Sequence, residues 1–226
     1  MLEHLRNKTI PSHLAADAED PYALIFVIND SKDEEGNIAS ESDILQASSV
    51  ALVELLLNDK AQEGVQAWLE GRIRKIAKRA RGAAWDKAAD AEIFFTEATH
   101  GSATVRAYTP IPLSAQPPVL KKLQVTGLQS ENTSTGYADE KSFLEVHVDE
   151  KLGMSTGKLV AQVGHAVQLF MMYGEESAVH TWLDDGSSII VVKMDDLSED
   201  ADVAVHDAGF TEVAAGSLTC TADFIA

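Results

Sequence analysis

Several polar residues interrupt the apolar segment GKLVAQVGHAVQLFMM at residues 157–172, and three of them could do chemistry together. Lys158, Gln162 and His165 are spaced i, i+4 and i+7, which at about 100° per residue places them on one stripe of a helix. A lysine at a helix N-terminus is unusual because the macrodipole disfavours positive charge there. Together with the free helix N–H groups it suits a negative ligand or a developing oxyanion. A solvated helix face with an incidental histidine remains the alternative.

A second set of candidate residues lies in the tail segment HDAGFTEVAAGSLTCTA. Asp207 directly precedes the small pair Ala208 and Gly209, where a backbone or substrate can approach closely, and Thr211 follows that turn. If the turn faces the helix, Asp207 could orient His165 or a water molecule, and Thr211 could hold a substrate oxygen. A purely structural turn is the alternative.

Strands are expected to position both sets. The runs FLEVHV at 143–148 and SSIIVVK at 187–193 flank the helix, and both are apolar and rich in β-branched residues. The same order occurs earlier in the chain. There an apolar run beginning at Tyr22 is followed by a capped stretch over 40–58 with helical spacing of its apolar residues.

An internal repeat strengthens this parallel. Residues 95–105, FTEATHGSATV, match residues 210–220, FTEVAAGSLTC, at six of eleven positions without a gap. The repeat predicts a duplicated α/β module. It also makes residues 72–81 a strand, although their apolar residues have helical spacing, because tertiary context often overrides local propensity.

Proline-rich and polar stretches divide the chain. We expect an N-terminal arm over 1–20, a first module over 21–108, a linker over 109–140 and a second module over 141–226. In the first module serines stand at the helix positions that match Lys158 and His165. We therefore expect the first module to have the same fold as the second but to lack its catalytic residues.

The first module carries a concentrated basic run. Residues 72–81 hold six of the 18 Lys and Arg residues and no acid. Such a run can dock a phosphate backbone, although a solvated strand is the alternative. The candidate contacts are Arg72, Arg74, Lys75, Lys78, Arg79 and Arg81.

The composition limits the remaining classes. The net charge of -18 should repel nucleic acid and anionic membranes unless a local basic patch exists. Cys220 is the only cysteine, and no signal-type or membrane-spanning segment is apparent, so a soluble, cytoplasmic protein is expected. GMSTGKL lacks the spacing of a phosphate-binding loop, and the histidines lack metal-ligand spacing. We therefore expect no cofactor and no metal.

The helix motif GKLVAQVGHA together with the tail motif DAGFTEVAAGSLT resembles the type 2 peptidyl-tRNA hydrolases. The resemblance covers residues 141–226. It implies three-layer α/β/α modules, each with a mixed, mostly parallel four-stranded sheet, and hydrolysis of the ester that joins a peptide to tRNA. The positions it carries over are Gly157, Lys158, Gln162, His165, Asp207 and Thr211.

Ester hydrolysis needs an activated water and positive charge near the tetrahedral oxyanion. We expect His165 and Asp207 to activate the water. Lys158, with the helix N–H groups, is expected to hold the oxyanion or the terminal phosphate. Gln162, Thr211 and Gly157 then position the substrate.

Two departures from the family pattern concern cations. The family usually has a lysine where this chain has Thr156, and commonly an arginine where it has Phe210. The basic run of the first module could supply the missing contacts if the modules form an intrachain pseudo-dimer. A catalytically inactive tRNA- or ribosome-binding protein of the same fold is the alternative to an enzyme.

Overall fold

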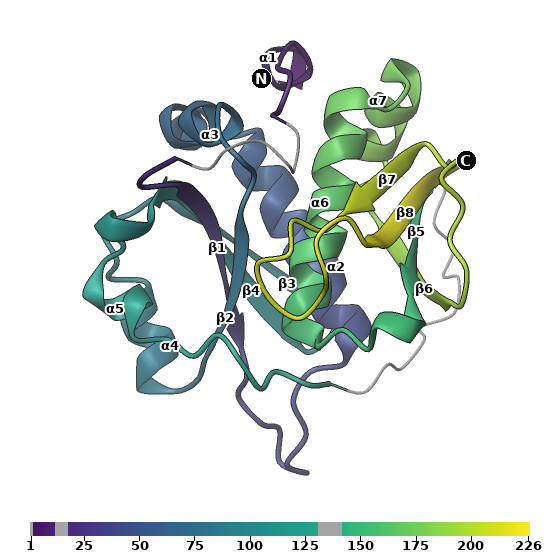
Figure 1. The fold of residues 1–226 in the computed structure, drawn as a ribbon. Helices are drawn as coiled ribbons and strands as arrows, with labels where there is room; N and C mark the ends of the chain where they lie inside the picture. The colour runs from purple at the N-terminus through teal and green to yellow at the C-terminus, as the bar shows by residue number, and fades with distance from the viewer. Residues whose placement is uncertain (1, 12–17, 131–141) are drawn as a thin grey trace.

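The computed structural model describes residues 2–11, 18–130 and 142–226. Within them the chain forms two α/β modules, each built on a four-stranded mixed sheet (Figure 1). Parts of the expected arm, 12–17, and of the expected linker, 131–140, lie outside the described residues.

The two sheets have the same strand order, as the internal repeat predicts. The first is ordered β2-β1-β4-β3 and the second β6-β5-β8-β7. The strands of the first sheet are β1 (Tyr22–Asn29), β2 (Lys75–Ala80), β3 (Phe95–His100) and β4 (Ala103–Pro112). Those of the second are β5 (Phe143–Asp149), β6 (Ile189–Met194), β7 (Val203–His206) and β8 (Leu218–Ile225).

The helices carry the connections between these strands. Their bounds are α1 (Leu2–Arg6), α2 (Glu41–Leu56), α3 (Gln62–Leu69), α4 (Ala83–Ala88), α5 (Pro118–Lys121), α6 (Thr156–Tyr173) and α7 (Glu176–Asp184). Short 3-10 turns are η1 (Asp59–Ala61), η2 (Leu113–Ala115) and η3 (Glu150–Leu152). Among the described residues no helix is long and apolar enough to cross a bilayer.

Helices α2 and α6 begin at serine caps. The side chain of Ser40 accepts a hydrogen bond from the backbone N–H of Asp43, and that of Ser155 accepts one from Lys158. Each cap satisfies one of the N–H groups left free at a helix start. The cap before α6 thereby sets the place of Lys158 in the first turn.

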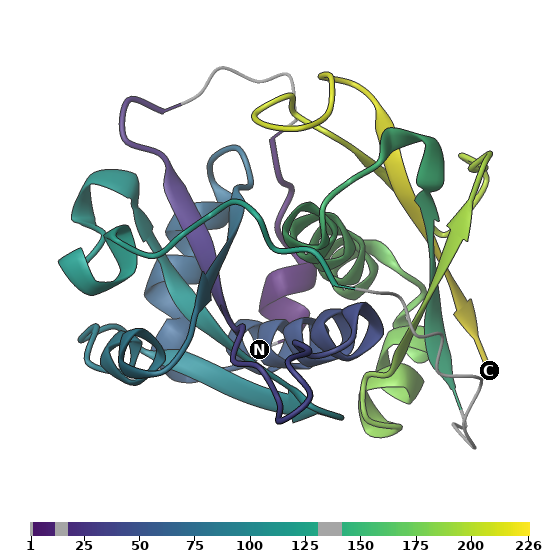
Figure 2. The ribbon, with the colours of Figure 1, turned by 90° about the horizontal axis from the view of Figure 1, so that it is seen from below.

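The central layer of the molecule is made of helices from both modules. Helices α2 and α6 pack against each other between the two sheets (Figure 2). One apolar core runs through this layer and includes Phe26 and Leu52 of the first module and Val146 and Val163 of the second. Helix α6 also packs on β2, so the second module's motif helix lies against the first module's basic strand.

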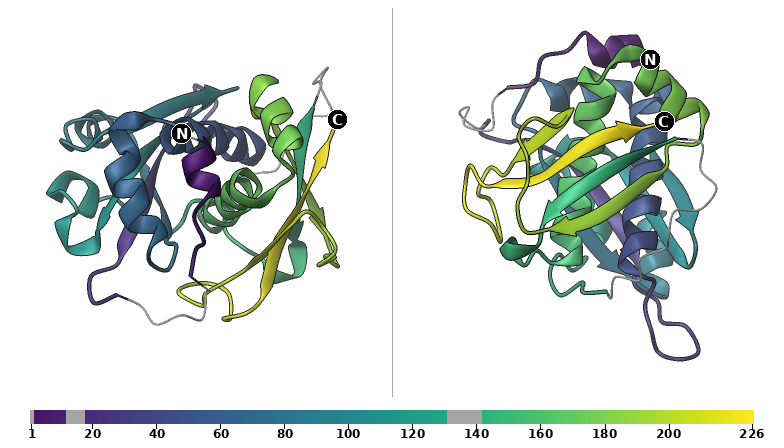
Figure 3. Two further views of the ribbon diagram at one scale, coloured as in Figure 1. Left: turned by 90° about the horizontal axis from the view of Figure 1, so that it is seen from above. Right: turned by 90° about the vertical axis from the view of Figure 1, so that its right-hand side faces the viewer.

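The outer faces of the two sheets differ. Helices α4 and α5 cover the first sheet, where Val27, Tyr108 and Leu120 share a second apolar cluster. No helix of the described residues covers the outer face of the second sheet (Figure 3). The expected three-layer arrangement is therefore correct for the first module and wrong for the second. The reason is local, because the acid-rich connection over 195–202 forms turns where the first module has α4.

Both sheets are mixed as expected, but they are not mostly parallel. Each has one parallel pair, β1–β2 or β5–β6, and two antiparallel pairs. The first module shows why, since β3 and β4 are joined by a tight turn at Gly101 and Ser102, and such a turn links only antiparallel neighbours.

Several boundaries differ from the sequence expectation. Residues 72–81 do contain a strand, β2, whose parallel pairing with the buried β1 outweighs the helical spacing. However, β4 continues to Pro112, and α5 packs on α4, so the first module extends beyond residue 108. The arm is also not purely peripheral, because α1 packs on α6 and Arg6 donates to the carbonyl oxygen of Gly174 at 2.7 Å.

The matched repeat segments are only partly equivalent in structure. Phe95 and Thr96 lie in β3, whereas Phe210 and Thr211 lie in the loop between β7 and β8. This tail loop, residues 207–217, is a second place where the second module differs from the first, besides the connection over 195–202.

Candidate functional site

A cleft of about 990 Å³ lies between the modules. One wall comes from the first module, residues 72–77 with Val125 and Thr126, and another from α6 and the tail loop. The six motif residues that the sequence singled out all line it: Gly157, Lys158, Gln162, His165, Asp207 and Thr211. The structure thus brings the helix motif and the tail motif together in one open cavity.

Lys158 and Asp207 form an ion pair in this cleft, in which Lys158 Nζ contacts Asp207 Oδ2. The two side chains are only 8% and 5% exposed. Lys158 Nζ also donates to Thr211 Oγ1 at 3.2 Å. Gln162 Nε2 donates to Asp207 Oδ2 at 2.8 Å. The lysine, amide, carboxylate and hydroxyl of the two motifs therefore form one connected cluster.

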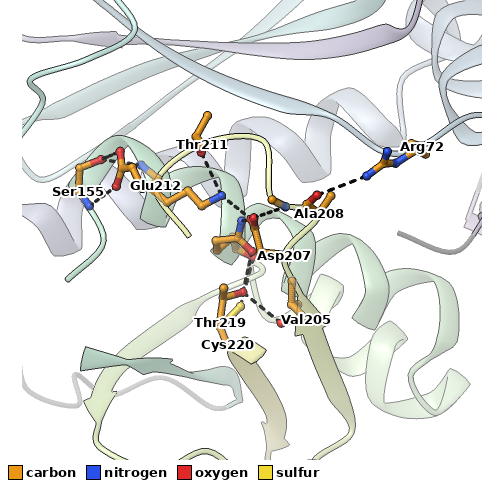
Figure 4. A network of polar contacts seen from close by, with 12 residues as sticks. Arg72, Ser155, Val205, Asp207, Ala208, Thr211, Glu212, Thr219 and Cys220 are labelled. Carbon is orange, nitrogen blue, oxygen red and sulfur yellow. Dashed lines mark hydrogen bonds and ion pairs between the residues drawn. The ribbon is translucent and has the colours of Figure 1, made fainter. Parts of the chain in front are cut away.

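The tail loop is held in place by contacts of Asp207 and of Glu212. Gly209 N donates to Asp207 Oδ1 at 2.7 Å, and Gly209 has φ +77°, a left-handed conformation that favours glycine. Glu212 accepts from the backbone N of Ser155 at 2.9 Å and from its hydroxyl at 2.6 Å (Figure 4). The loop is thereby tied to the residue that caps α6.

Gln162 is held by the last strand. Thr219 Oγ1 donates to Gln162 Oε1 at 2.7 Å, which leaves the amide nitrogen of Gln162 directed at Asp207. Gly157 lies in the first turn of α6, where an added Cβ would stand 3.9 Å from the Cβ of Ala77 in β2. A larger side chain at Gly157 would narrow the cleft between the modules.

His165 is not paired with Asp207, contrary to the expectation from the sequence. Its Nδ1 lies 3.1 Å from Lys75 Nζ of the first module. Burial and the positive charges of Lys75 and Lys158 hold the pKa of His165 well below its ordinary range. The sequence placed Lys75 in a tRNA-docking strand and gave no signal of this contact, which depends on how the modules pack.

The six basic residues of 72–81 do not form one patch. Lys78 points to the opposite face of the first sheet, where its Nζ donates to Leu120 O at 2.8 Å. Arg79 pairs with Asp30 at 3.0 Å, and Arg81 lines a separate cavity of about 240 Å³ with Asp30. The remaining three line the cleft: Arg72, Arg74 and Lys75.

Arg72 and Arg74 stand at the cleft beside Phe210. Their guanidinium carbons lie 4.5 and 3.8 Å from the centre of the Phe210 ring. Such cation–π contacts hold a guanidinium in place without neutralising it. Phe210 occupies the position of the usual family arginine, so the first module brings two guanidinium groups to the place where the second lacks one.

Thr156, which stands where the family usually has a lysine, is buried against the first module. Thr156 is fully buried, and its hydroxyl donates to Glu41 Oε2 at 2.8 Å. The second oxygen of Glu41 lies 2.7 Å from Lys193 Nζ. A lysine side chain at 156 would have to occupy this intermodule contact, which explains physically why a small hydroxyl residue stands there.

The cleft carries an excess of positive groups. Four Lys and Arg side chains and two carboxylates line it, although the whole chain has a net charge of -18. Within the described part of the chain, no three His, Cys, Asp or Glu side chains are grouped so that they could hold a metal ion. The fold and the site define an α/β protein with a lysine–carboxylate pair in a cationic cleft.

Comparison with known proteins identifies the family. Residues 144–223 match the family model "Peptidyl-tRNA hydrolase PTH2". The peptidyl-tRNA hydrolase of Thermoplasma acidophilum is 32% identical over 90 residues, 33% of this chain and 77% of that protein. Those of Methanocaldococcus jannaschii and Halobacterium salinarum are 34% and 36% identical, over 34% and 31% of this chain and 80% and 74% of theirs.

No solved structure gives a significant match. The chain belongs to the peptidyl-tRNA hydrolase PTH2 family, and its similarity to the curated relatives is confined to about the C-terminal third.

Proposed function

We propose that this protein hydrolyses the ester bond of peptidyl-tRNA in the cleft between its modules, releasing the peptide and a reusable tRNA, and that it does so in the cytoplasm. The observation that carries the proposal is the cluster of Lys158, Asp207, Gln162 and Thr211 in an open, cationic cavity. The second module supplies the reacting groups, and the first closes the other side of the site.

Lys158 and Asp207 are given complementary tasks. The Lys158 ammonium, at the positive end of α6, stabilises the oxyanion that forms when water attacks the ester carbonyl. Asp207 holds the lysine and accepts the proton of the attacking water, because it is the carboxylate of the cluster. Thr211 and Gln162 position substrate and carboxylate. The absence of a contact between Asp207 and His165 removes the imidazole from this pair.

Arg72 and Arg74 are proposed to bind the phosphates next to the tRNA 3′ end. Arg72 Nη2 reaches Ala208 O of the tail loop at 3.5 Å, and its buried Nε has no hydrogen-bond partner among the described residues. Both arginines line the cleft, and a guanidinium group offers paired N–H donors that suit phosphate oxygens. Lys78 and Arg79 are not included in this role, since both donate to acceptors within the first module.

The test of the enzyme proposal is release of a labelled N-blocked amino acid from tRNA. Lys158→Met should lower kcat by about 100-fold or more through loss of an oxyanion partner, and Asp207→Asn by a similar factor through loss of the group that accepts the water proton. Lys151→Met is the matched control, because Lys151 is an exposed lysine of the same module that pairs with Asp196 outside the cleft. Equally negligible release by the parent protein and all variants would refute hydrolysis.

The inactive binding protein remains the second candidate, favoured by the burial of Thr156 under the first module. Its discriminating result is tRNA binding without release. In either case tRNA binding should weaken as salt rises. In the double variant Arg72→Gln/Arg74→Gln, the slope of log binding constant against log salt should become shallower by the amount expected for loss of up to about two phosphate contacts. An unchanged slope would remove the docking role of these two residues.

A further inference from the structure

The side chain of Lys75 crosses from the first module into the motif helix of the second. Lys75 is buried, and its stem packs over Gly164 of α6, where an added Cβ would lie 3.2 Å from Lys75 Cδ. A glycine at 164 therefore lets the lysine pass. Beyond Gly164, Lys75 Nζ lies 3.1 Å from His165 Nδ1 and 2.5 Å from Gln168 Oε1. These two residues are neighbours on the same face of α6, within one helical turn of each other.

Among the described residues, two of the three partners of Lys75 Nζ are acceptors. Gln168 offers its carbonyl oxygen, and Trp68 offers the face of its ring, whose centre is 4.8 Å from Nζ. An ammonium group has three donors and no acceptor, and an aromatic face attracts a cation. The third partner, His165 Nδ1, must then present its lone pair to the lysine.

A neutral imidazole has one protonated nitrogen and one with a lone pair. With the lone pair on Nδ1 facing Lys75, the proton lies on Nε2. His165 lines the cleft, and Nε2 makes no hydrogen bond to a described residue. The hydrogen-bonding capacity of Nε2 is therefore left for a ligand.

We propose that Lys75 is a positioning residue that holds His165 in the Nε2–H tautomer, so that His165 acts in the cleft as a hydrogen-bond donor to an oxygen of the substrate. The acceptor is the ester carbonyl oxygen or an oxygen of the terminal ribose. The inference rests on the proposed function for its substrate, and it replaces water activation by His165, because an Nε2–H imidazole has no lone pair on that nitrogen.

The charges around the pair support a neutral histidine. His165 is faced by Lys75 from β2 and by Lys158 from its own helix. Burial lowers the pKa of His165 most, and the two ammonium groups lower it further. Burial also lowers the pKa of Lys75 well below its usual range, with the nearby Cys220 thiol of β8 acting in the opposite direction. Two positive charges 3.1 Å apart are disfavoured, so a proton gained by the pair belongs to the lysine.

The experiment is a long-range ¹H–¹⁵N correlation spectrum of the imidazoles in the full chain, with His165 assigned by the signals lost in His165→Asn. We expect Nε2 protonated, Nδ1 unprotonated, and no titration of His165 between about pH 5.5 and 8. Protonated Nδ1 in the parent protein would overturn the proposal. This result requires no variant of Lys75 and no hydrolytic activity.

Lys75→Met is the second arm. Loss of the lysine donor frees Gln168 Oε1 to accept from a protonated Nδ1, so both tautomers should be populated and the ¹⁵N chemical shifts of the two ring nitrogens should become more similar. The pKa of His165 should also rise, because a neighbouring positive charge is gone. Lys78→Met is the matched control, being a buried lysine of the same strand that faces away from the cleft. A Lys75→Met spectrum and titration identical to those of the parent protein would also overturn the proposal.

Ester release separates this inference from the proposed function. If the chain is a hydrolase, Lys75→Met should lower kcat about tenfold with little change in KM, less than the roughly 100-fold expected for loss of the whole donor in His165→Ala. If the parent protein releases nothing, the proposed function fails, whereas the tautomer is still decided by the spectrum. An unchanged kcat in an active enzyme would refute a role of Lys75 in positioning.

Discussion

The ion pair of Lys158 and Asp207 should be visible in stability as well as in activity. Lys158→Met leaves Asp207 with two donors, Gln162 Nε2 at 2.8 Å and Gly209 N at 2.7 Å. Asp207→Ala leaves the ammonium with the Thr211 hydroxyl at 3.2 Å and deprives both other donors of their acceptor. Removing one partner of a buried pair costs about 3–5 kcal/mol, so we expect about 3 for the lysine and about 5 for the aspartate.

The double variant carries neither charge. It should therefore cost about as much as Asp207→Ala alone, which gives a coupling free energy of about 3 kcal/mol between the two side chains. The measurement is urea unfolding of the four proteins followed by far-UV circular dichroism, with the slope of unfolding free energy against urea checked for constancy.

The surface pair Lys151–Asp196 is the matched control for this cycle. It has an N–O distance of 3.0 Å, but its side chains are 57% and 95% exposed. Water and salt screen such a pair, so its cycle should show coupling close to zero. Additive effects of the Lys158 and Asp207 substitutions, within about 0.5 kcal/mol, would show that the two groups do not interact in solution and would refute the geometry on which the proposed function depends.

Three further predictions concern stability and reactivity. Lys75→Met should stabilise the protein near neutral pH, because burial lowers the native pKa of Lys75 below its unfolded value of 10.5. The gain should shrink as pH rises from the native pKa toward 10.5, a range in which only the unfolded state keeps the proton. Parallel pH profiles of the two proteins from urea unfolding would contradict this. Gly209→Ala should destabilise the protein by roughly 1–3 kcal/mol more than Gly216→Ala. Both glycines have positive φ, but only at Gly209 would an added Cβ meet Ala215, at 2.7 Å. Equal urea midpoints of the two variants would contradict this. Cys220 should resist thiol reagents at pH 8 until urea unfolds the chain, because burial raises its pKa to about 12; rapid labelling of native protein would contradict it.

Much of the frame could be predicted from the sequence because it depends on local patterns. The two modules and the strand at β2 were predicted from the apolar run of β1, the capped start of α2 and the internal repeat. The helical stripe and the tail turn also gave the residues that line the cleft. These signals depend on the spacing of residues within one helix or turn, and that spacing decides which side chains share a face whatever the rest of the chain does.

The relation between the modules could not be predicted in the same way. Lys75 and His165 are far apart in sequence, and their contact depends on β2 packing against α6. The pairing of Asp207 with Lys158 instead of His165 likewise depends on the path of the tail loop. The second module was predicted to have helices on both faces of its sheet because the family resemblance implies them. The short acidic connection over 195–202 forms turns instead of the expected outer helix.

The shared middle layer also affects when the site comes into being during synthesis. One side of the cleft is made from β2, whereas Asp207 and Thr211 lie more than a hundred residues later in the chain. A ribosome-bound fragment that has folded its first sheet already displays Arg72 and Lys75 but has no opposing wall. The cleft, and any hydrolysis in it, therefore requires the tail loop to have been synthesised and packed against α6, so a fragment that ends before Asp207 has no complete site.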